Sequence, residues 1–294
     1  MRDDISPIEQ VGEIIFDKIL SRDPHVGGHG TEVLGAQGSG KTSFLLHLAD
    51  IFTKRYPDEI LFWRESVETP VQFTRFPKWR IFVERGLHFR ILDKLDGGRE
   101  IDIPYETFDT LPVVSYNRQK LRDPEFFRKN QENKEIQDDI FSTICSRARG
   151  GELTVLYFKE EFSWVDLMRF LRTRPKFQTL LLDEMEEIFP AATKEELWHR
   201  IEWAKDNFKH IRKGLVNLIG NTQDTTDIDW RIRRKLQIHI YLPGAVPDRR
   251  SRVIKKAMSV LKPGEAYMDW CWTLFGKINF PAYRVTDSLW EVRL

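Results

Sequence analysis

The chain has 294 residues, 41% of them hydrophobic and 31% charged, and its formal net charge is +1. This length is enough for one large α/β domain or two small ones, and the near-neutral charge excludes a global basic field for nucleic acid, so any such contact must be a local patch. The two cysteines have no metal-ligand spacing and indicate reduced thiols of a cytosolic protein, and no apolar run is long enough to predict a membrane span.

The amino-terminal part is expected to form a helix followed by a flexible lead-in. Residues 1–4 lack the pattern of a signal peptide, and apolar residues between 6 and 20 recur at helical spacing. A glycine-containing stretch then leads into the first strand, expected at residues 32–34. We therefore treat residues 1–30 as a unit that precedes the main domain, residues 31–294.

Residues 35–42 match the phosphate-binding loop G-x-x-x-x-G-K-S/T, with the helix that should leave the loop expected at 43–52. Glycines allow consecutive backbone N–H groups to turn toward an anion. Lys41 can reach the β- and γ-phosphates of a nucleotide, and the hydroxyl of Thr42 can ligate Mg²⁺. The residues predicted to bind the nucleotide are Gly35, Ala36, Gln37, Gly38, Ser39, Gly40, Lys41, Thr42 and Ser43.

The middle of the chain has a less regular pattern. A second strand is expected at 59–63, and the apolar stretches 79–83 and 88–92 are expected to pair as a hairpin. Glycines and prolines interrupt the segment that follows, and charges of opposite sign alternate over 118–139, which is typical of a solvated region. We therefore expect residues 64–150 to be an insertion in the main domain.

Regular alternation of strands and helices resumes after residue 150. Ser163 and Asp166 have the spacing of a capping box at the start of a helix, and Thr193 with Glu196 has the same pattern. The alternation predicts an α/β fold of the P-loop NTPase type, a mostly parallel central sheet with helices on both faces. Strands are expected at 153–158, 177–182, 215–220, 236–242, 265–268 and 282–285, and helices at 163–171, 193–211 and 249–261.

Two polar positions at strand ends complete the predicted site. Asp183 follows the apolar run 180–182 and can hold Mg²⁺ beside Thr42, while Glu184 can orient the attacking water. An acidic start to a helix is the alternative for this pair, but the upstream phosphate loop favours the metal site, and Glu184 favours hydrolysis over simple binding. Gln223 follows a later strand and could contact the γ-phosphate or the water; a polar turn residue is the alternative.

These motifs occur in a characteristic order: the phosphate loop, Asp183-Glu184, the basic turn Arg212-Lys213-Gly214, and Thr222-Gln223 at the end of a strand. A D-x-x-I-R-like segment at 227–233 and an L-x-P-G-E-like turn at 261–265 follow. In this order the chain resembles the FtsK–HerA superfamily, P-loop motors that pump DNA in chromosome segregation, conjugation and viral packaging. The resemblance covers roughly residues 28–56 and 153–286 and does not extend to 64–150.

The resemblance implies an ATP-hydrolysing, Mg²⁺-dependent motor that moves duplex DNA without sequence preference as a ring, usually a homo-hexamer. It implies an arginine that reaches the site of the neighbouring subunit, for which Arg231 and Arg233 are candidates, together with Arg234 and Arg212; solvated surface arginines are the alternative. Basic runs at 231–235 and 249–256 are the densest candidates for DNA contact. A cytoplasmic or virion-associated location and a partner at a portal, capsid or membrane would fit such a motor.

Two other functions remain open at this point. An AAA+ ATPase that remodels protein or nucleoprotein complexes would use Asn217 or Asn221 as its polar sensor, and it would carry a helical lid after the last core strand. The residues after 261 read as strands, which favours the motor. A non-enzymatic assembly subunit is disfavoured by the intact set Lys41, Thr42 and Asp183-Glu184.

Overall fold

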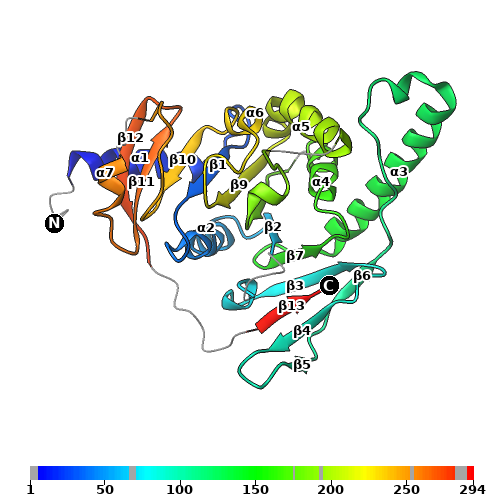
Figure 1. Cartoon of the computed structure of the whole chain (residues 1–294), viewed down its shortest axis with the longest axis horizontal. Helices are drawn as coiled ribbons and strands as arrows, with labels where there is room; N and C mark the ends of the chain where they lie inside the picture. Colours follow the sequence, from blue (N-terminus) through cyan, green and yellow to red (C-terminus); the bar gives the residue numbers. More distant parts are fainter. Residues whose placement is uncertain (1–5, 66–70, 175, 192–194, 252–254, 282–289) are drawn as a thin grey trace.

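A ten-stranded sheet organises the chain (Figure 1). The computed structural model describes residues 6–65, 71–174, 176–191, 195–251, 255–281 and 290–294. Neighbouring strands run parallel except for the pairs β10–β11 and β11–β12, which confirms the predicted mostly parallel sheet. In spatial order the strands are β12 (Leu274–Asn279), β11 (Glu265–Trp270), β10 (Ile238–Tyr241), β1 (Gly30–Leu34), β9 (Val216–Thr222), β8 (Gln178–Leu182), β2 (Ile60–Arg64), β7 (Leu153–Tyr157), β3 (Trp79–Glu84) and β6 (Glu106–Phe108).

Helices cover both faces of this sheet, as predicted. Side chains alternate between the faces along each strand, so in β2 Leu61 and Trp63 join one apolar cluster while Phe62 joins the other. The first cluster packs α1 (Pro7–Leu20) and α2 (Lys41–Arg55). The second packs α3 (Pro124–Arg147), α4 (Ser163–Leu171) and α5 (Glu195–Lys213); the shorter helices are α6 (Trp230–Arg233) and α7 (Lys255–Met258).

The predicted hairpin of 79–83 with 88–92 is wrong. The first stretch is β3, which lies parallel between β7 and β6 in the large sheet. The second belongs to β4 (Arg90–Asp93), which pairs with β5 (Arg99–Ile101) and β13 (Trp290–Arg293) in a separate antiparallel sheet. The physical reason is that β3 carries apolar side chains on both faces, with Ile81, Phe82 and Val83 each 1% exposed, and therefore needs cover on both.

Residues 64–150 contribute to the large sheet as well as to its periphery. Beyond β3 and β6, they supply η1 (Phe73–Arg75), η2 (Lys120–Arg122) and the 24-residue helix α3. The carboxylate of Asp123 caps α3 by accepting from the N–H of Phe126 at 2.8 Å. The carboxyl-terminal part of α3 packs into the core through Phe141 and Ile144, whereas its amino-terminal part extends away from the sheet (Figure 1).

Several local predictions also need correction. Ser163 is the first residue of α4 rather than its cap, and Asp166 is buried in an ion pair with Arg200 at 2.7 Å. The helix expected at 249–261 is present in the described residues only as the four residues of α7. The strand expected at 282–285 and the cap at Thr193–Glu196 lie outside the described residues and side chains. Within the described part of the chain, no helix is both long and apolar enough to cross a membrane.

Candidate nucleotide site

The strand order brings the predicted site residues to one edge of the sheet. β9 lies between β1 and β8, and β2 lies on the other side of β8. The register pairs Leu34 with Thr222, and Leu182 with both Gly220 and Arg64. Since these strands are parallel, the segments that follow their carboxyl ends converge, as at ligand sites of open α/β sheets.

The segment after β1 has the conformation of a phosphate-binding loop. Gly38 and Gly40 adopt positive φ angles of 75° and 94°, and α2 begins at Lys41 directly after them. Nζ of Lys41 donates to the carbonyl oxygens of Gly35 at 2.9 Å and Ala36 at 3.2 Å, which holds the ammonium over its own loop. Burial lowers the pKa of Lys41, and the negative charge of Asp183 acts in the opposite direction. Oγ of Ser39 is buried without a partner among the described residues and packs closely against Gly35, where a Cβ would lie 2.2 Å from it.

Two oxygen atoms at this edge fit a Mg²⁺ ion. Oγ1 of Thr42 donates to Oδ1 of Asp183 at 3.1 Å, which joins the helix after the loop to the end of β8. Burial raises the pKa of Asp183, while hydrogen bonds from Asn221 and Thr42 lower it. A hydroxyl and a single carboxylate beside the phosphates suit Mg²⁺, which usually keeps several waters and takes few protein ligands.

Glu184 is held in a left-handed backbone conformation, with φ 54° and ψ 61°. For a residue other than glycine this costs about 1–2 kcal/mol and persists only where the surroundings enforce it. Part of the enforcement comes from Asn221, whose Oδ1 accepts from the N–H of Glu184 at 2.8 Å and whose Nδ2 donates to Asp183. Gly220 makes room for this turn, because a Cβ there would lie 2.5 Å from Sδ of Met185, the residue after Glu184.

Asn221 is therefore a candidate site residue that the sequence analysis named only for the alternative AAA+ function. It is 1% exposed and connects the predicted metal ligand to the predicted base through one amide group. The sequence does contain an indication of its role. Asn221 lies one residue before Thr222, the last residue of β9, and two residues before Gln223.

A charged pair at the carboxyl end of β2, Arg64 and Glu65, was also missed. Arg64 is buried and donates to Glu161 at 2.7 Å, and its guanidinium also contacts the carbonyl oxygen of Asp183 and the carboxylate of Glu187. Glu65 accepts from Nε1 of Trp63 at 2.8 Å, and burial, followed by the charge of Asp183, raises the pKa of Glu65 to about 8. The sequence indication of this pair was that two charged residues directly follow the apolar strand expected at 59–63.

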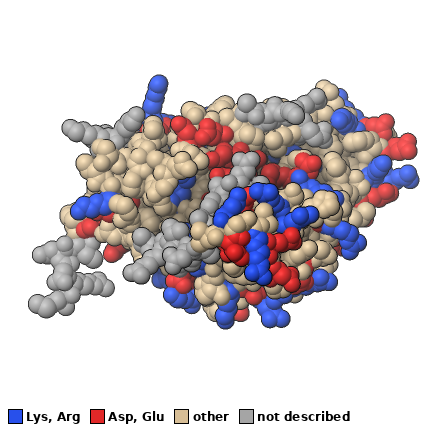
Figure 2. Space-filling view, turned by 60° about the horizontal axis from the view of Figure 1, so that its bottom comes forward, with Lys and Arg blue, Asp and Glu red and all other residues tan. Residues whose placement is uncertain are grey.

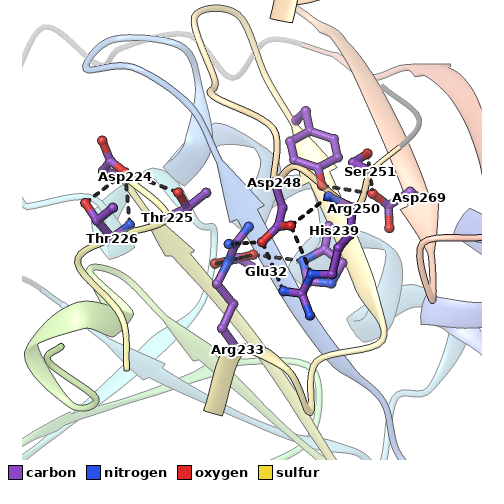
Figure 3. Close-up of polar contacts among 11 residues, drawn as sticks. Glu32, Asp224, Thr225, Thr226, Arg233, His239, Asp248, Arg250, Ser251 and Asp269 are labelled. Atoms are coloured by element: carbon purple, nitrogen blue, oxygen red, sulfur yellow. Dashed lines mark hydrogen bonds and ion pairs between the residues drawn. The ribbon is translucent and has the colours of Figure 1, made fainter. Parts of the chain in front are cut away.

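Gln223 lies at the same edge, directly after β9, with an exposed side chain. The loop that follows begins with a compact turn, in which the carboxylate of Asp224 accepts from the N–H and the hydroxyl of Thr226 at 2.9 and 3.0 Å (Figure 3). The structure thus places Gln223 between the end of β9 and a turn of defined geometry.

The two candidate arginines on α6 pair with acids of their own chain. Nε of Arg233 lies 2.9 Å from both carboxylate oxygens of Glu32, and its Nη1 donates to Asp248 at 2.8 Å (Figure 3). Arg233 is only 5% exposed. Arg231 binds Asp229 at 2.6 Å and also contacts Glu202, but it lies nearer the surface.

The fold has counterparts among solved structures. No family model and no curated protein sequence matches the chain. The genome packaging NTPase B204 from Sulfolobus turreted icosahedral virus 2, in complex with ATP-gammaS, aligns with a TM-score of 0.50 and 14% identity over 89% of this chain and 100% of that one. The same protein in complex with AMPPCP gives a TM-score of 0.51 and 13% identity over 87% and 97%.

The chain shares the fold of this viral packaging NTPase. At such low identity the likeness establishes the fold alone, and it confirms the P-loop NTPase class expected from the motifs.

Proposed function

We propose that the chain is an ATPase that uses hydrolysis to translocate or package DNA as a ring-shaped oligomer. The observation that carries the proposal is the joined set Thr42, Asp183, Asn221 and Glu184 beside the loop of Lys41. A metal site, a cation over the phosphate loop and a positioned carboxylate are the parts that phosphoryl transfer to water requires. The shared fold with a genome packaging NTPase supports DNA as the substrate of the motion.

Each part of the site has a proposed role. The N–H groups of residues 35–43 and the amino terminus of α2 bind the phosphates, and Lys41 neutralises charge on the β- and γ-phosphates. Thr42 and Asp183 hold Mg²⁺, which would stabilise the developing charge on the phosphate oxygens. Glu184 orients and polarises the attacking water, and Gln223 senses the γ-phosphate.

We assign the arginine that reaches the nucleotide site of the neighbouring subunit to Arg231 rather than Arg233. The buried guanidinium of Arg233 is bound by two acids of its own chain. If it moved to a neighbouring subunit, the buried carboxylate of Glu32 would lose its guanidinium partner. Arg231 is closer to the surface, with 19% of its side chain exposed, and could exchange Asp229 and Glu202 for a phosphate of the neighbour.

The contact with DNA must be local. Positive and negative side chains are interspersed on the face shown in Figure 2, so this face offers no single-sign field for a phosphate backbone. A homo-hexameric ring would repeat a small basic patch around a central pore, and Arg234 and Lys235, both exposed directly after α6, are candidates for that patch.

The structure disfavours the AAA+ alternative. Among the described residues that follow β10, the regular elements are the four-residue helix α7 and the antiparallel strands β11, β12 and β13. A helical lid, which that alternative requires, is not built by these residues.

The experiment is an ATPase assay with and without long duplex DNA, combined with the mass of the assembly in the presence of nucleotide and Mg²⁺. We expect DNA to stimulate hydrolysis and Lys41→Ala and Glu184→Gln to abolish it, with Glu184→Gln still binding ATP because the loop and metal ligands remain. Arg90→Gln, an exposed change on the separate small sheet, is the control and should hydrolyse normally. Equal rates with and without DNA under conditions where the ring forms would refute the motor.

A further inference from the structure

A second loop, residues 243–247, touches the phosphate loop and has no role in the function proposed above. It follows β10, and its sequence Pro-Gly-Ala-Val-Pro contains no polar side chain. The N–H of Ala36 donates to the carbonyl oxygen of Pro243 at 3.3 Å, and a Cβ on Gly244 would lie 2.7 Å from the Cβ of Ala36. An apolar loop and the phosphate loop are therefore in direct contact.

The fold holds the apolar loop 243–247 in place. Leu242 and Ala245 are 0% and 2% exposed and pack in the core, and the N–H of Ala245 donates to the carbonyl oxygen of Leu242 at 3.0 Å. At the other end, the carboxylate of Asp248 accepts from Nη1 of Arg233 at 2.8 Å (Figure 3). Between these anchors Val246 remains 43% exposed. The loop thus presents apolar surface without being mobile packing for the core.

The strand order determines which end of a nucleotide this loop can meet. β1 lies between β9 and β10. The residues proposed to meet Mg²⁺, the attacking water and the γ-phosphate are Asp183, Glu184 and Gln223, and they follow β8 and β9. Because the phosphates bind to the loop after β1, the γ-phosphate end faces β9 and the nucleoside end faces β10. The apolar loop is the segment into which β10 leads.

We propose that the apolar loop 243–247 packs against the base of the bound nucleoside triphosphate and discriminates little between adenine and guanine. This rests on the proposed function, because the phosphates must occupy the adjacent loop. Every base has an apolar face that can stack, whereas discrimination between bases needs hydrogen-bonding groups in the site. Two of the five residues are prolines without an N–H, and the N–H of Ala245 and the carbonyl oxygen of Pro243 already have partners within the chain.

The test compares ligands with and without a base. Isothermal calorimetry in the presence of Mg²⁺ measures the affinity for ATP, for GTP and for inorganic tripolyphosphate, which carries the phosphates alone. We expect ATP and GTP to bind with dissociation constants within about tenfold of each other, since a difference of one hydrogen bond to a neutral group is worth no more.

Two substitutions at the exposed Val246 should change the affinity for ATP in opposite directions. Val246→Asn removes apolar contact area and should weaken ATP about three- to tenfold. Val246→Phe offers the base a larger stacking surface and should strengthen ATP by about the same factor. Neither variant should change the affinity for tripolyphosphate, because both side chains are uncharged.

Val113→Asn is the matched control. Val113 is 60% exposed and its carbonyl oxygen accepts from Nδ2 of Asn133 at 2.8 Å, so it lies beside α3. The same chemical change at this site should leave the affinities for all three ligands unchanged. Unfolding curves of the variants confirm that the proteins compared are folded.

The outcomes separate the base contact from the proposed function. If the unmodified protein binds neither ATP nor tripolyphosphate, the nucleotide site is rejected, and the base contact with it. If it binds both, and the two Val246 variants bind ATP as the unmodified protein does or change tripolyphosphate to the same extent, only the base contact is rejected. A preference of more than about tenfold for one purine would show that hydrogen bonds read the base and would overturn the proposed lack of discrimination.

Discussion

Replacing Asn221 with alanine should uncouple nucleotide binding from hydrolysis. The change removes a hydrogen bond to the carboxylate of Asp183, worth about 1.5–3 kcal/mol, and one from the N–H of Glu184 at 2.8 Å, worth about 0.5–1.5 kcal/mol. Without the second bond the left-handed backbone of Glu184 loses part of what enforces it and relaxes. If about 2–3 kcal/mol of this loss falls on the transition state, kcat drops about 30- to 160-fold.

Asn217 offers a matched control on the same strand. It is also 1% exposed and also makes two hydrogen bonds, accepting from the N–H of His29 at 2.9 Å and donating to Thr179 at 3.1 Å, but it lies at the opposite end of β9. Both alanine variants should lose stability in denaturant unfolding, and only Asn221→Ala should lose kcat at saturating ATP. A kcat of Asn221→Ala within about threefold of Asn217→Ala would refute the reasoning.

Two further predictions concern stability. Arg233→Ala should cost about 3–5 kcal/mol of unfolding free energy, because it leaves the 0% exposed carboxylate of Glu32 without its guanidinium. Arg250→Ala, at a side chain that is 46% exposed, should cost about 1 kcal/mol or less, and equal losses for the two variants in urea unfolding would contradict the prediction. Burial lowers the pKa of His29 from 6.5 to about 4, so the unfolded chain takes up a proton that the folded chain does not, and stability should fall as the pH drops from 6.5 toward 4. The loss attributable to His29 at pH 5 is about 2 kcal/mol and should vanish in His29→Leu, measured by unfolding at pH 7 and pH 5.

The parts of the site that the sequence predicts are those encoded by neighbouring residues. The loop 35–42 and the pair Asp183-Glu184 depend on a strand, a short turn and residues of defined type, and all of these are consecutive. The parallel sheet follows from apolar runs such as 180–182, which need cover on both faces. The physical cause of each of these features lies within a few consecutive residues, so a single sequence is enough to predict them.

The remaining features depend on contacts between distant segments. Asn221 gains its importance only because β9 lies beside β8, and Glu65 gains its backbone partners only because η1 folds back to the end of β2. The hairpin prediction failed for a related reason. The stretches 79–83 and 88–92 are close in the chain, but β3 finds its partner in β7, more than sixty residues later, where both of its apolar faces are covered.

The same strand order ties α6 to the predicted catalytic carboxylate. The segments that follow Glu184 and Gln223 run side by side, with the N–H of Ala191 donating to Asp227 at 2.8 Å, and the N–H of Asp229 donating to the carbonyl of Phe189 at 2.8 Å. Because Asp229 caps α6, the helix that carries Arg231 cannot be displaced without displacing one or both of these segments. An arginine that serves the neighbouring site would therefore be mechanically linked to the turn that positions Glu184 in its own subunit.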